Sequence, residues 1–90
     1  MKNINFMMEY VKQYLDGNIN RFEFELDFDY LIMKKHKQMC RENREYAELF
    51  YDYISESGVD AGKNLPDDKF KKLIKKQYNE VKDIADNGFC

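Results

Sequence analysis

Hydrophobic residues recur at helical spacing over the first sixteen positions of the chain. At about 100° per residue, one face gathers Ile4, Met7, Val11, Tyr14 and Leu15. Asn3 or Asn5 can cap the start of such a helix, and Asp16-Gly17 is a pair that commonly ends one. The pattern predicts a helix over residues 5–16.

The segment over residues 22–30 carries two conflicting patterns. Apolar and acidic residues alternate in FEFELDFDY, which is typical of a strand with one buried face. Asn20, followed by Glu23 three residues later, is instead typical of a helix start. A helix would have two apolar sides, one with Phe22, Leu26, Tyr30 and Met33 and one with Phe24, Phe28, Leu31 and Ile32. Since no second alternating segment could pair with a strand, a helix buried on two sides is favoured and a strand remains the alternative.

The second half of the chain predicts two further helices. Residues 34–44 are polar and basic, and they are expected to hold a helix end and the start of the next helix. Over residues 41–57 apolar positions recur at helical spacing, and Gly58 stands where a residue just past a helix end belongs. A loop over 58–64 precedes Pro66, which is expected in the first turn of a last helix that ends at Asn87-Gly88. Four helices with short connections predict an all-α fold, namely an antiparallel up-and-down four-helix bundle.

Length and composition agree with one small helical domain spanning residues 1–90. Hydrophobic residues make up 43% of the chain and aromatic residues 16%, which is too apolar for a disordered chain. No stretch approaches the roughly 18–20 apolar residues of a membrane span. The first fifteen residues lack the continuous apolar run of a signal peptide. We therefore expect a cytoplasmic protein with no membrane partner.

Residues that could carry chemistry are sparse and scattered. His36 is the only histidine and lies in a basic run, so a surface histidine is expected rather than a catalytic base. Cys40 and Cys90 are the only cysteines, and they match no metal-binding spacing. The chain contains neither a phosphate-binding glycine loop nor a nucleophile motif. We expect no enzyme activity, no metal and no cofactor.

Acidic residues are concentrated on the third predicted helix. Residues 45–60 contain no Lys or Arg and five acids: Glu45, Glu48, Asp52, Glu56 and Asp60. The first four fall within an arc of about 80°, where like charges cost about 0.2–0.5 kcal/mol per pair in an isolated helix. A basic protein partner would explain the arrangement, with Tyr51 as an aromatic contact and Glu23 and Glu25 as secondary contacts. A solvated face, neutralised by lysines of a neighbouring helix, is the alternative.

Nucleic acid is the other class of partner that the charge pattern suggests. The stretch KFKKLIKKQ (69–77) places several lysines on one face of the last helix. The net charge of −2 argues against binding to phosphates, which requires a basic surface. No nucleic-acid partner is therefore expected, and the lysines are interpreted as the solvated side of an amphipathic helix.

The segment YVKQYLDGNINRFEFELDF (10–28) resembles the opening of the colicin D-type immunity proteins. In that family an amphipathic helix ends in a short polar turn, an isoleucine follows, and a Phe-Glu-like pair comes early in the second helix. Here these positions are Asp16-Gly17-Asn18, Ile19, and Phe22-Glu23 or Phe24-Glu25. The remaining two thirds of the chain matches only in length, helix count and acidic surface. The basic segment 34–44 and the lysine-rich last helix depart from the family picture.

The resemblance implies a bacteriocin immunity protein that binds the nuclease domain of its cognate toxin. In that family the toxin cleaves tRNA, and acidic immunity residues occupy its basic active-site cleft in place of RNA phosphates. A monomer that forms a heterodimer with the toxin is then expected. A small helical adaptor or regulator, self-associating through its spare aromatic residues, is the alternative function.

Overall fold

The computed structural model describes residues 1–88, and its first element is a helix that buries the predicted apolar face. Helix α1 spans Lys2–Leu15. Its buried residues are Ile4, Met7, Met8, Val11 and Tyr14. The helix ends as predicted, because Gly17 has a φ of +87°, a conformation that glycine adopts without strain. It starts three residues earlier than predicted, and no side chain of its own caps it.

Helix α2 spans Arg21–Glu42, so the segment 22–30 is helical and the strand alternative is wrong. The Asn20 side chain accepts a hydrogen bond from the backbone N–H of Glu23 at 2.8 Å, as in a capping box. The helix continues through most of the polar segment 34–44, because Ile32 and Met39 extend its buried face. The expected break is confined to Asn43, whose side chain caps the next helix at the backbone N–H of Tyr46.

The third helical segment differs from its prediction at its C-terminal end. Helix α3 spans Arg44–Phe50 and continues without a break into η1, a π-helix that spans Tyr51–Asp60. Gly58 is buried inside η1, so its prediction as a residue past the helix end is wrong. A Cβ atom at Gly58 would lie 3.1 Å from Cδ1 of Ile74. The glycine is therefore explained by close packing against the last helix rather than by a turn.

Helix α4 spans Asp67–Asp86 and packs along η1. Pro66 immediately precedes its first residue, and Asp67 and Asp68 occupy its first turn, where acidic groups favour the helix dipole. Its apolar face is buried at four positions: Phe70, Ile74, Tyr78 and Val81. Gly88, with a φ of +84°, follows its last turn as the sequence predicts.

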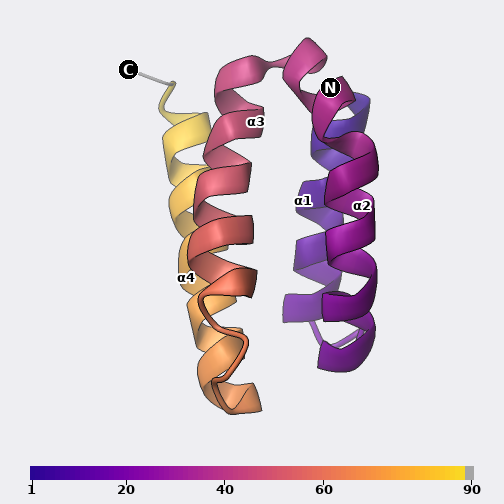
Figure 1. Ribbon diagram of the computed structural model, residues 1–90. Coiled ribbons are helices and arrows are strands. Elements are labelled where there is room, and N and C mark those ends of the chain that lie inside the picture. Colours follow the sequence, from indigo (N-terminus) through magenta and orange to yellow (C-terminus); the bar gives the residue numbers. More distant parts are fainter. Residues whose placement is uncertain (89–90) are drawn as a thin grey trace.

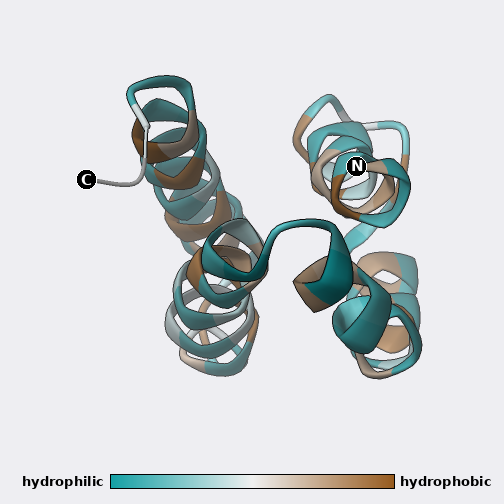
Figure 2. Cartoon of the chain, turned by 90° about the horizontal axis from the view of Figure 1, so that it is seen from above, coloured by the Kyte–Doolittle hydropathy of each residue, from teal (hydrophilic) through white to brown (hydrophobic). Residues whose placement is uncertain are grey.

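The helices lie as two adjacent pairs, α1 beside α2 and the continuous α3–η1 beside α4 (Figure 1). Seen from above, α2 also adjoins α3, and α1 adjoins α4 (Figure 2). Aromatic rings fill the space between them, with Tyr14 stacked on Phe24 at a centroid distance of 4.4 Å and Phe28 stacked on Phe50 at 6.0 Å. Residues 1–88 thus form an all-α bundle of four helices with an aromatic core. None of these helices has the length and apolar character needed to span a membrane.

Candidate protein-binding surface

The five acids predicted on the third helix all lie at the surface of α3 and η1. We call Glu45, Glu48, Asp52, Glu56 and Asp60 the acidic surface; each of these residues is exposed. They face outward because Ala47, Phe50 and Ile54 occupy the opposite side of the same helix and are fully buried. The change from α- to π-helical geometry at Tyr51 does not bury any of them.

Most of this negative charge is not compensated within the described chain. Glu48 pairs with Arg44 at 3.1 Å, and Asp60 pairs with Lys63 at 3.8 Å. Within residues 1–88, Glu45, Asp52 and Glu56 form no ion pair. Both existing pairs are more than half exposed, so they contribute little stability.

Within residues 1–88, no lysine of α4 forms an ion pair with the acidic surface. Lys71, Lys72 and Lys75 line a depression against α1 instead, together with Lys12 and Tyr78. Of the alternative interpretation, the exposed, solvated face is present, whereas ion pairs with lysines of α4 are absent from residues 1–88.

The acidic surface includes a shallow depression between α3 and α4. Its lining combines the acids Glu45, Glu48 and Asp52 with the apolar side chains of Leu49 and Ile84. Lys and Arg side chains have an apolar stem and a charged end, so such a lining suits them. Carboxylates accept strong, charge-assisted hydrogen bonds from these cations. The depression can therefore receive a basic side chain of a partner.

Tyr51 lies on another side of the same helix, toward α2. Its ring centroid is 5.1 Å from that of His36, and 36% of the residue is exposed. His36 also approaches Cys40, with 3.8 Å between Nε2 and Sγ. Tyr51 is thus partly accessible, but it does not line the depression at Leu49 and Ile84.

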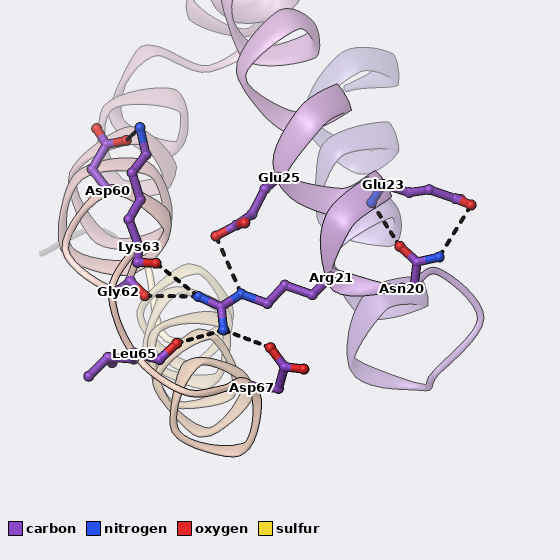
Figure 3. Close-up of polar contacts among 9 residues, drawn as sticks. All are labelled: Asn20, Arg21, Glu23, Glu25, Asp60, Gly62, Lys63, Leu65 and Asp67. Atoms are coloured by element: carbon purple, nitrogen blue, oxygen red, sulfur yellow. Dashed lines mark hydrogen bonds and ion pairs between the residues drawn. The ribbon is translucent and has the colours of Figure 1, made fainter.

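Glu23 and Glu25, the predicted secondary contacts, both have structural roles. Glu23 accepts a hydrogen bond from the side-chain amide of Asn20 at 3.4 Å, beside the bond that caps α2. Glu25 lies 3.5 Å from Nε of Arg21 and is only partly exposed (Figure 3). Glu25 also lines a depression with Lys63, the residue that pairs with Asp60. Only Glu25 of the two therefore comes near the η1 end of the acidic surface.

Arg21 fixes the relation between α2 and the segment that connects η1 to α4. Its guanidinium donates hydrogen bonds to the carbonyls of Leu65 and Lys63 at 2.6 and 3.1 Å, and to the Asp67 carboxylate at 2.8 Å (Figure 3). It also lies over the ring of Phe70, 4.2 Å from its centroid. These contacts hold Lys63 and the end of η1 against the first turn of α2.

Four apolar side chains on one side of α2 are exposed. The prediction that this helix is buried on two sides is therefore wrong for the side that carries them. We call them the apolar stripe: Phe22, Leu26, Tyr30 and Met33, which are 75%, 64%, 57% and 77% exposed. The buried side is the one with Phe24, Phe28 and Ile32. The helical wheel grouped the exposed residues correctly, but periodicity does not say which apolar side has a neighbour. The stripe is a second candidate contact surface.

Known proteins give no further guidance to the site. No family model, curated protein or solved structure matches this chain. In the described part of the chain, no three His, Cys, Asp or Glu residues are grouped so that they could hold a metal ion. Cys90 lies outside the described residues. The candidate surfaces therefore rest on the chain's own residues.

Proposed function

We propose that this chain is an immunity protein that binds a basic, tRNase-like bacterial nuclease domain and blocks its active site. One observation carries the proposal: Glu45, Asp52 and Glu56 are exposed on one helix side without an ion pair in residues 1–88. In this proposal the four helices form an antiparallel up-and-down bundle, and the chain acts in the cytoplasm without catalysis or cofactor. The resemblance of residues 10–28 to the colicin D-type immunity proteins supports the same function.

The chemistry of a nuclease explains why such a surface would bind it. A nuclease cleft that holds RNA phosphates must be basic, and carboxylates can take the place of those phosphates. Concentrated negative charge also speeds the association of the two proteins, an effect that salt weakens. The apolar floor at Leu49 and Ile84 adds contact area for the stem of a basic side chain.

Charge reversal tests the proposal. The variant Glu48→Lys/Asp52→Lys is expected to remain folded, because both side chains are exposed, and to lose binding to a cognate tRNase-like nuclease domain. The matched control Glu9→Lys/Asp16→Lys makes the same change in net charge on α1, and it should bind normally. Titration calorimetry over a range of salt measures both. Unchanged affinity and salt dependence in the first variant would refute the assignment of the acidic surface.

A small helical adaptor is the second candidate function. The exposed apolar stripe on α2 favours it, because large apolar patches often mark protein contacts. The two functions differ in which surface binds the partner. A partner whose binding survives reversal of Glu48 and Asp52, but is lost with Leu26→Asp, would support the adaptor.

A further inference from the structure

The apolar stripe runs along the outward side of α2 and has no cover within residues 1–88. Its members recur at intervals of four, four and three residues, which keeps them on one side of the helix. From Phe22 to Met33 the stripe extends about 17 Å at 1.5 Å per residue. Tyr30 and Met33, near its middle and end, are both more than half exposed. A contact surface of this shape suits another helix.

Charged residues on one flank of the stripe change sign halfway along α2. Glu23 and Asp27 lie in the first half, and Lys34 and Arg41 lie in the second. On a helical wheel these four fall within about 40° of one another, beside the stripe. All four are exposed, and none forms an ion pair in the described chain. Lys37, also exposed, continues the line of the stripe one turn past Met33.

We propose that two copies of this chain pair through α2, antiparallel, with a two-fold axis near Tyr30. A two-fold contact uses the same surface of both copies, so each flank of α2 faces its own counterpart running in the opposite direction. The acidic half of the flank then meets the basic half of the second copy.

The charged residues set the register, and the stripe fits it from Leu26 to Met33. With the axis near Tyr30, Leu26 packs against Met33 of the second copy, and the two Tyr30 rings meet. In that register Asp27 comes opposite Lys34 of the second copy. Glu23 likewise comes opposite Lys37 of the second copy. Each pairing lies within one residue of its symmetric position, so one arrangement packs Leu26, Tyr30 and Met33 together and pairs these charges.

The contact would run along most of the molecule. With the axis near Tyr30 it would extend from Phe22 to Gln38, about 24 Å. The longest dimension of the molecule is 33 Å. The proposal is independent of nuclease binding, because the acidic surface lies on α3 and η1. It replaces the expected monomer with a dimer in which each copy keeps its acidic surface.

Mass measurement of the purified chain tests the dimer without any partner. Sedimentation equilibrium should give twice the 10.9 kDa of one chain. Met33→Glu should give a single chain, since it would place a charge against Leu26 of the second copy. Phe6→Glu, at an apolar residue of α1 that is 46% exposed, is the matched control and should remain dimeric. Circular dichroism checks that each variant is folded.

A charge swap tests the antiparallel register. Asp27→Lys and Lys34→Asp should each weaken dimerisation about three- to tenfold, because each creates two repulsive contacts across the axis. The double variant should restore it. A wild-type chain that stays monomeric into the high micromolar range would overturn the proposal and leave the stripe to a protein of another sequence. A double variant no better than the single ones would overturn the register.

Discussion

The carboxylate of Glu42 accepts hydrogen bonds from the backbone N–H and the side-chain amide of Asn3, at 2.7 and 2.8 Å. It also accepts one from the backbone N–H of Ile4 at 3.0 Å. The first N–H groups of a helix have no partner within it, and an anion there is favoured by the helix dipole. Thus the last residue of α2 caps α1, and the cap predicted from Asn3 or Asn5 is wrong.

Replacement of Glu42 by Gln should destabilise the fold, and the effect should depend on pH. Burial raises the pKa of Glu42, but the hydrogen bonds from Ile4 and Asn3 outweigh it, so the pKa lies below its ordinary value of 4.5. A lowered pKa means that the stabilisation is complete above 4.5 and is lost as the pH falls through the lower, folded value. Thermal unfolding of both proteins should therefore differ at neutral pH and converge in acid. Glu45→Gln, at an exposed acid, should show no such difference.

Replacement of Arg21 by Met should lower the free energy of unfolding by about 2 kcal/mol, because charge-assisted hydrogen bonds to Leu65, Lys63 and Asp67 are lost. Arg21→Lys should recover only part of this, since an ammonium cannot reach several carbonyls in one plane. Urea unfolding measures both. Lys12→Met, which removes an exposed pair with Asp16, is the control and should leave the stability nearly unchanged. Equal stability of all three variants would contradict the role of Arg21.

Replacement of Gly62 by Ala should cost about 1–3 kcal/mol, because the added methyl group overpacks the contact with α4. Its Cβ would lie 2.9 Å from Cδ1 of Phe70 and 3.0 Å from the carbonyl oxygen of Gly58. Phe70 is fully buried and has little room to move. Gly17→Ala is an informative comparison, since no atom lies within 4 Å of its Cβ and only its positive φ opposes the change. If Gly62→Ala cost less than Gly17→Ala, the packing argument would fail.

Ionisation of Tyr10 should occur well above the usual range for tyrosine. Burial raises the pKa of its hydroxyl from 10.0 to about 12, and the negative charges of Asp27 and Glu23 act in the same direction. A raised pKa means that this contribution to stability is intact below pH 10.0 and is lost between there and about 12. Ultraviolet titrations of the wild type and of Tyr10→Phe should differ only by a step near pH 12, which the variant lacks. If the variant instead lacked a step near pH 10.0, the prediction would be contradicted.

The capping box at α2 could be read from the sequence because it is local. Asn20 and Glu23 are three residues apart, and their contact depends only on the chain between them. The cap on α1 could not be read in this way, since Glu42 is 39 residues from Asn3. The same distinction applies to Arg21, whose hydrogen-bond partners Leu65 and Asp67 lie more than forty residues further along the chain.

For the candidate surfaces, too, the sequence predicted the local arrangement but not the contacts between helices. The spacing of Glu45, Glu48 and Asp52 placed them on one outward side, and the structure has them there. Whether lysines of α4 form ion pairs with them depended on where α4 packs, which spacing does not determine. The exposure of the apolar stripe was decided in the same way, because helical periodicity identified both apolar sides of α2 but not the one that has a neighbour.

The sequence by itself determined the helices, most of their ends and the grouping of side chains around each axis. These follow from contacts between residues a few positions apart, such as caps, glycine turns and the period of 3.6. Only the tertiary structure decided that Gly58 and Gly62 serve close packing on α4 and that Glu42 caps α1. It also decided that Phe22, Leu26, Tyr30 and Met33 face outward. These outcomes depend on which helices become neighbours, and that is set by the packing of the whole core.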